Sequence, residues 1–117
     1  MKYIYIMLIA LSLSGCWESD VGRSYYPSGK IKTSALVRNG LVSGPATMFY
    51  ESGSKMSEAI YKSGILHGDS FSYYENGDLK ARASYDFGVL NGTSQQWNKE
   101  GDMIHSVVFD KGVLVNK

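Results

Sequence analysis

Apolar and polar residues alternate along much of the chain, and residues 78–85 show the pattern most clearly. Within the stretch DLKARASY, two sets of side chains take alternate positions: Leu79, Ala81, Ala83 and Tyr85 on one side, Lys80, Arg82 and Ser84 on the other. A period of two residues predicts a β-strand with one half-buried face. Beyond residue 16 no stretch shows a helical period of useful length, so the pattern predicts an all-β fold.

The strand pattern recurs every 24 residues, which divides the chain from Tyr25 onwards into four rows. Each row begins with an aromatic residue: Tyr25, Phe49, Tyr73 and Trp97. The eleventh position of the rows holds small apolar residues: Ala35, Ala59, Ala83 and Val107. A repeat of this length indicates units that bury their apolar surface only by stacking on neighbouring units.

Glycine recurs at the fifth, sixteenth and twentieth positions of the rows. These glycines are Gly29, Gly40, Gly44, Gly53, Gly64, Gly68, Gly77, Gly88, Gly92, Gly101 and Gly112. Because glycine adopts positive φ at no steric cost, they predict turns. Each row then contains two strands and two turns, which predicts an antiparallel meander of about seven or eight strands.

The residues between each row's aromatic residue and its first glycine predict a three-residue hairpin loop, a type I turn followed by a G1 bulge. Such a loop places the first-position aromatic residues on the face of the alanine column, whereas a two-residue loop would place their neighbours there. The favoured loop leaves a tyrosine ladder on the second face: Tyr26, Tyr50 and Tyr74. We interpret this ladder as the candidate binding face, with ordinary cross-strand aromatic packing as the alternative.

The N-terminal residues are typical of an export signal rather than of a folded domain. Lys2 precedes an apolar stretch at residues 3–13, shorter than the ~20 residues of a spanning helix. The following LSGC, which ends in the sole cysteine, Cys16, resembles the lipobox of bacterial lipoproteins. That resemblance implies cleavage before Cys16 and a lipid anchor on its thiol. A free buried cysteine after an ordinary signal peptide is the alternative.

The chain is thereby divided into a signal peptide (residues 1–15), a lipidated N-terminus with a short linker (16–24) and a repeat domain (25–117). Trp17, rather than an aspartate, follows the cysteine. By the sorting rules of the lipoproteins that it resembles, this favours the outer membrane, with the domain facing the periplasm or the cell exterior.

Charge and chemistry exclude several classes of function. Lys and Arg number 12 against 11 Asp and Glu, so no strong field draws the chain to nucleic acid. His67 and His105 have no partner at ligand spacing, so we expect no metal site. Ser52 and Lys55 match an S-x-x-K motif, but they lie in a glycine turn instead of one helical turn apart. We therefore expect no catalytic residue, no cofactor and no small-molecule substrate.

The tyrosine–glycine pattern resembles the MORN repeat (membrane occupation and recognition nexus). It is closest to the bacterial variant found in small proteins described as toxin–antitoxin antitoxins. The resemblance is clearest at YKSG (residues 61–64) with Gly68 and at YDFG (85–88) with Gly92, while Val37 and Asn116 depart from the pattern. It implies an array of β-hairpins and no particular activity.

Together these features predict a lipid-anchored, non-enzymatic binding or scaffold lipoprotein that engages an envelope protein or polymer. The alternative is an antitoxin or immunity protein that neutralises a partner toxin.

Overall fold

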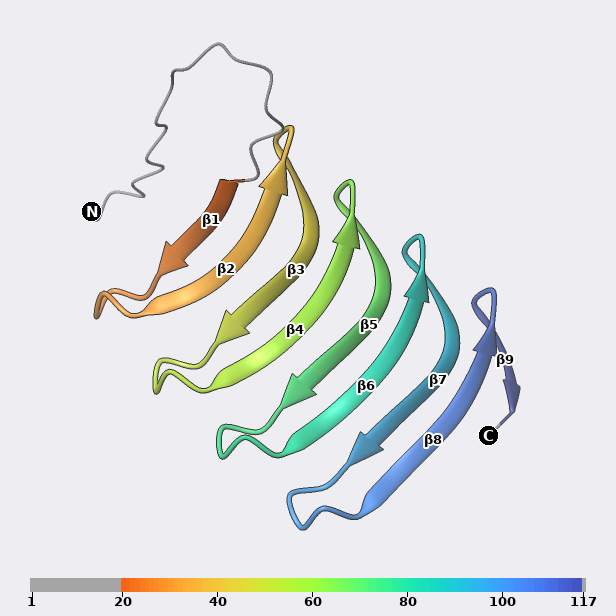
Figure 1. The fold of residues 1–117 in the computed structure, drawn as a ribbon. Helices are drawn as coiled ribbons and strands as arrows, with labels where there is room; N and C mark the ends of the chain where they lie inside the picture. The colour runs from red at the N-terminus through yellow and green to blue at the C-terminus, as the bar shows by residue number, and fades with distance from the viewer. Residues whose placement is uncertain (1–19, 117) are drawn as a thin grey trace.

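The computed structural model describes residues 20–116. They form one antiparallel sheet whose nine strands follow one another in chain order, as Figure 1 shows. The strands are β1 (Asp20–Tyr25), β2 (Ile31–Arg38), β3 (Leu41–Phe49), β4 (Lys55–Lys62), β5 (Ile65–Tyr73), β6 (Leu79–Asp86), β7 (Val89–Trp97), β8 (Met103–Asp110) and β9 (Val113–Asn116). The prediction of an all-β antiparallel meander is confirmed.

The sheet starts earlier than the sequence predicts. β1 begins at Asp20, inside the stretch 16–24 that was expected to be a linker, and it pairs with β2 from Asp20↔Val37 to Tyr25↔Ile31. Its side chains are all exposed, so the hydrophobic pattern carries no sign of the strand. The repeat domain therefore extends to Asp20, and β1 explains why the sheet has more strands than expected. The predicted signal peptide and Cys16 lie outside the described residues.

Two kinds of connection alternate along the sheet. At one edge, every connection is the expected three-residue loop. In the first, the Gly29 N–H donates to the Tyr26 carbonyl at 2.9 Å, and the Tyr26 N–H donates to the Lys30 carbonyl at 2.8 Å. Gly29 has φ 89°, as a type I turn with a G1 bulge requires. The same pair of hydrogen bonds recurs in the other three loops. All eleven glycines singled out in the sequence have positive φ. Eight of them lie in turns as predicted, but Gly44, Gly68 and Gly92 lie inside β3, β5 and β7, where the pairing with the preceding strand is irregular, so the prediction of a turn was wrong there.

At the opposite edge of the sheet, successive strands are connected by two-residue turns. In each turn both central residues have positive φ, the type I′ geometry that matches the twist of the flanking strands. The pairs are Asn39–Gly40, Ser63–Gly64, Phe87–Gly88 and Lys111–Gly112. Asn-Gly is the favoured pair for this turn, whereas a bulky residue such as Phe87, at φ 44°, is strained there.

A second bulge reverses the predicted faces. Next to each three-residue loop the pairing skips one residue, as where Ser24↔Thr33 is followed by Tyr25↔Ile31 and Lys32 is left over. The residues left over in the four rows are Lys32, Met56, Lys80 and Ile104. One extra residue moves every later side chain of the strand to the other face. The three-residue loop was right, but the alanine column shares its face with Tyr26 and its equivalents, so the predicted face assignment was wrong.

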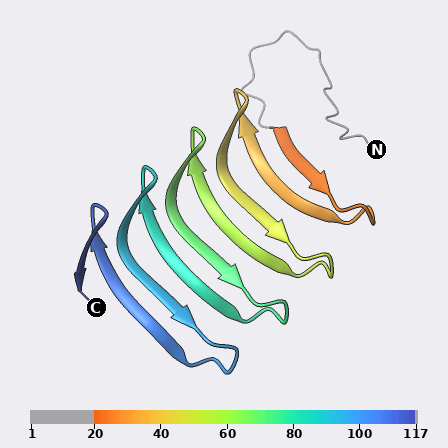
Figure 2. The same ribbon diagram turned by 180° about the vertical axis from the view of Figure 1, so that it is seen from behind.

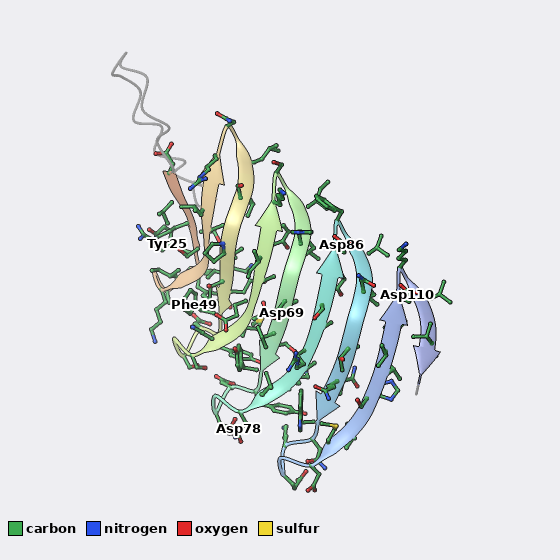
Figure 3. The ribbon with its side chains drawn as sticks, turned by 45° about the vertical axis from the view of Figure 1, so that its right-hand side comes forward. Tyr25, Phe49, Asp69, Asp78, Asp86 and Asp110 are labelled. Carbon is green, nitrogen blue, oxygen red and sulfur yellow. The ribbon has the colours of Figure 1, made fainter. Side chains whose placement is uncertain are left out.

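The sheet is a single curved layer (Figures 1 and 2), and side chains project from both of its faces (Figure 3). Of the described residues only Val107 is buried, with 6% of its surface exposed. Most other side chains along the middle of the strands are half-buried by their neighbours in the same layer. Stability therefore comes from contacts between successive rows, as in other repeat proteins, and not from a closed core.

Candidate functional site

The tyrosine ladder joins each row to the next. The Tyr26 hydroxyl donates to the Phe49 carbonyl at 2.7 Å, Tyr50 to the Tyr73 carbonyl at 2.8 Å, and Tyr74 to the Trp97 carbonyl at 2.9 Å. Each acceptor lies 23 residues further along the chain. The phenol groups are therefore engaged inside the sheet, and only the half-buried rings face outwards. The sequence indicated the ladder but not these bonds, because they depend on the face that the second bulge sets.

We call the face with the ladder and the alanine column the tyrosine face. Cross-strand pairs place small residues along its middle, among them Ala46 opposite both Ala35 and Ala59, and Ser70 opposite Ala83. A second aromatic row follows towards the two-residue turns: Tyr61, Tyr85 and Phe109. Among the residues paired across β2 to β8, no Asp, Glu, Lys or Arg lies on this face.

Lysines stand at one border of the tyrosine face, beside the three-residue loops. The Lys32 ammonium lies 5.7 Å from the centre of the Tyr26 ring, and the Lys80 ammonium lies 5.6 Å from that of Tyr74. At these distances the cations are attracted to the rings. Both lysines are the extra residues of the second bulge. The face is thus an uncharged, partly aromatic surface with a basic margin, an arrangement suited to contact with another macromolecule.

The opposite face, which we call the charged face, carries the first-position aromatic residues together with ionic groups. Figure 3 shows Tyr25 and Phe49 near the three-residue loops, and Asp86 and Asp110 at the other end of the sheet. Near the middle, the Tyr73 hydroxyl donates to Glu58 at 2.5 Å, and the Lys55 ammonium pairs with the same carboxylate at 3.2 Å.

Hydrogen bonding in this cluster changes two pKa values. The bond from Tyr73 lowers the pKa of Glu58 from its ordinary value of 4.5, and Lys55 lowers it further, against a smaller opposing effect of burial. The bond to Glu58, with burial and the carboxylate charge, raises the pKa of Tyr73 to about 12. Both shifts result from one contact between neighbouring rows, the hydrogen bond from Tyr73 to Glu58.

The cluster predicts a pH dependence of stability. A lowered carboxyl pKa stabilises the fold above the unfolded pKa, and this contribution is lost as the pH falls through the folded value. We therefore expect Glu58→Gln to lower the melting temperature at neutral pH and to have progressively less effect below about pH 4. Tyr73→Phe should remove one phenol that titrates near 12 in the near-ultraviolet absorbance. An unchanged tyrosine titration in Tyr73→Phe would contradict the assignment.

At the two-residue-turn edge, His67 and Asn91 support the turns of the following row. The His67 Nδ1 accepts from the Phe87 N–H at 3.2 Å, and the Asn91 Oδ1 accepts from the Lys111 N–H at 3.1 Å. His67 Nδ1 also lies 3.2 Å from an Asp86 oxygen. Asp86, Phe87, Val89, Asn91 and Lys111 line a shallow hollow of about 270 Å³.

The residues that the sequence offered as catalytic or metal-binding candidates do not come together as a site. Ser52 lies beside the Ser54 hydroxyl at 3.1 Å, while Lys55 pairs with Glu58, so the S-x-x-K match places no base on a nucleophile. Across residues 20–116, His, Cys, Asp and Glu form no group of three that could hold a metal ion. The same range holds no helix of the length and hydropathy that a membrane crossing demands.

Comparison with protein families identifies the repeat. The MORN repeat variant matches residues 21–39, 43–63 and 66–86, which together make up more than half of the chain. Comparison with curated proteins gave no significant match, and neither did comparison with solved structures. The matched segments cover β1 to β6, and the remaining strands continue the same sheet in the same register. MORN repeats serve in general as non-enzymatic binding modules, and this chain belongs to the MORN repeat variant family.

Proposed function

We propose that this chain is a binding module, held at the bacterial outer membrane by a lipid on Cys16, that docks an envelope protein or polymer through its tyrosine face. The absence of charge among the paired residues of that face, from β2 to β8, carries the proposal. Charged side chains are depleted, and aromatic ones enriched, where proteins bury surface against a partner. A sheet also needs something to cover its apolar face, and this one has no second layer among its described residues.

The distance from the lipid supports a partner close to the membrane. Only residues 17–19 separate Cys16 from the first residue of β1. Four extended steps of chain reach at most about 14 Å. A sheet tethered so closely meets partners in, or next to, the membrane that holds it.

The ladder bonds change which residues should be mutated to test docking. Substituting the tyrosines would disturb the contacts between rows, so a loss of binding would be ambiguous. Neighbouring residues of β7 offer a matched pair instead. Ser94 lies on the tyrosine face opposite Ala83 and Val107, while Thr93 lies on the charged face opposite Val108. Both residues are half-buried, so lysine at either position has a similar intrinsic cost.

The experiment compares capture of membrane partners by the full-length chain. With Ser94→Lys we expect about tenfold less of the cross-linked partner, identified by mass spectrometry, whereas Thr93→Lys should capture as much as wild type. Equal capture by both variants would exclude docking through the tyrosine face. If the captured partner is a toxin that the chain neutralises, the antitoxin alternative replaces the scaffold role.

The anchor is tested separately. Cys16→Ser should abolish lipid labelling and release the chain from the membrane fraction without changing the melting temperature of the sheet. If wild type carries no acyl group by mass spectrometry, the localisation is wrong, while the test of the tyrosine face still stands.

A further inference from the structure

Four exposed aliphatic side chains run along the two-residue-turn edge of the sheet. Each is the first residue of the strand after a turn: Leu41, Ile65, Val89 and Val113, with 48%, 46%, 44% and 64% of their surfaces exposed. The first three lie against the turn glycine of the following row. A Cβ on Gly112, for example, would be 3.0 Å from Val89 Cγ1. The four side chains therefore follow one another along the edge, and we call them the aliphatic ridge.

A column of charges lies directly beside the ridge. The cross-strand partners of the ridge residues are Arg38 for Leu41, Lys62 for Ile65, Asp86 for Val89 and Asp110 for Val113. Directly paired residues project from the same face of a sheet, here the charged face. The column is basic in the first two rows and acidic in the last two, so its sign reverses at the middle of the molecule.

This reversal makes the edge complementary to itself. Rows are two strands apart, about 10 Å, so the four positions are evenly spaced. A two-fold axis between the second and third rows would bring Arg38 of one copy to Asp110 of the other, and Lys62 to Asp86. The same axis would bring Leu41 to Val113, and Ile65 to Val89. A partner of uniform charge would instead be repelled by half of the column.

We propose that the aliphatic ridge and its charge column form a homodimer interface, in which two copies of this chain pack edge to edge in opposite directions. Isologous contacts of this kind require the same patch on both copies, and this patch meets that requirement in both charge and hydrophobicity. The interface uses the charged face, so the tyrosine face stays open in both copies. The proposal does not depend on the proposed function.

Interactions within the chain decide which charge pair matters most. His67 lies 3.2 Å from Asp86, and Lys62 lies 5.4 Å from the centre of the Phe87 ring, so the inner pair is partly engaged already. Neither Arg38 nor Asp110 forms an ion pair with another residue of the described range. Lys111, next to Asp110, weakens the acidic half by one charge. The outer pair should therefore contribute more than the inner pair.

The contact is small. Four half-exposed aliphatic side chains and their charged partners correspond to the lower end of specific interfaces, which bury less than about 1,200 Å² in total. We expect a dissociation constant on the order of 10 µM at low salt, rising with ionic strength as the exposed charges are screened.

Two charge-reversed variants of the full-length chain test the proposal. Arg38→Glu with Lys62→Glu makes the column entirely acidic, and Asp86→Lys with Asp110→Lys makes it entirely basic. In sedimentation velocity at about 100 µM, ten times the expected dissociation constant, wild type should be dimeric and each variant alone monomeric. An equimolar mixture of the two should restore the dimer, as should one chain carrying all four changes. Circular dichroism checks that each variant is folded.

A neutral substitution tests the ridge itself. Val113→Thr changes the most exposed ridge residue while keeping its shape, and it should weaken the dimer about tenfold without affecting the melting temperature. A monomeric wild type at every concentration would overturn the proposal. So would a dimer that persists in both charge variants, since the second copy would then dock elsewhere, or a mixture that stays monomeric.

Discussion

Replacing Tyr26, Tyr50 and Tyr74 together with serine is expected to remove about 6 kcal/mol of stability. Each substitution removes a half-buried ring from the tyrosine face and a hydrogen bond to the next row, at about 2 kcal/mol per site. A domain of this kind is stable by only about 5–15 kcal/mol, so the triple variant should be largely unfolded or melt at a much lower temperature. Thermal and urea unfolding followed by circular dichroism measure the loss.

Phenylalanine at the same three positions is the matched control. It keeps the rings and removes only the three hydroxyl donors, so we expect a loss of about 3 kcal/mol and a fold that remains cooperative. A serine variant within about 1 kcal/mol of wild type would show that the ladder does not hold the rows together. The tyrosines would then be surface residues available to a partner.

The second large effect is expected for Gly88→Val, with a loss of about 3 kcal/mol. Gly88 has φ 81°, a conformation that a β-branched residue adopts only under strain. An added Cβ would also lie 3.3 Å from Ile65 Cγ2 of the preceding row, so the neighbouring side chain must move. The N–H of Gly88 donates to the Leu66 carbonyl at 2.6 Å, so displacement of the turn also weakens a bond between rows.

Gly101 separates backbone strain from crowding. Its φ is 90°, close to that of Gly88, but nothing lies within 4 Å of an added Cβ. Gly101→Val should therefore cost only the strain, about 2 kcal/mol. Urea unfolding of both variants makes the comparison. If Gly101→Val is as damaging as Gly88→Val, the contact between rows at the turn contributes nothing.

Both predictions follow from the fact that contacts between successive rows stabilise this protein. With Val107 as the one buried side chain of the described range, no core can compensate for a lost contact. Each row is held by the hydroxyls, turns and side chains of its neighbours, so damage to a central row should propagate further than damage to a terminal one.

The sequence alone determined the period, the strand type and the three-residue loops. These features are local: alternation of apolar residues defines a strand, and a recurring glycine marks a position where φ must be positive. The three-residue loops follow from the spacing of aromatic residue and glycine within a few residues. All eleven glycines accordingly have the predicted positive φ. The lipid anchor on Cys16 is also a sequence prediction, and it remains one.

Tertiary structure decided which face each side chain takes. The extra residue in each row is Lys32, Met56, Lys80 or Ile104, and residues so different share no sequence signal for a bulge. One extra residue exchanges the two faces of a strand. The bulge in each row therefore places the tyrosines of the ladder on the same face as the alanine column, contrary to the prediction. Strand β1 was missed because its exposed side chains carry no pattern, and only backbone pairing with β2 defines it. The hydroxyl bonds and the reversal of charge along the ridge join residues from different rows, so they exist only once the rows lie side by side.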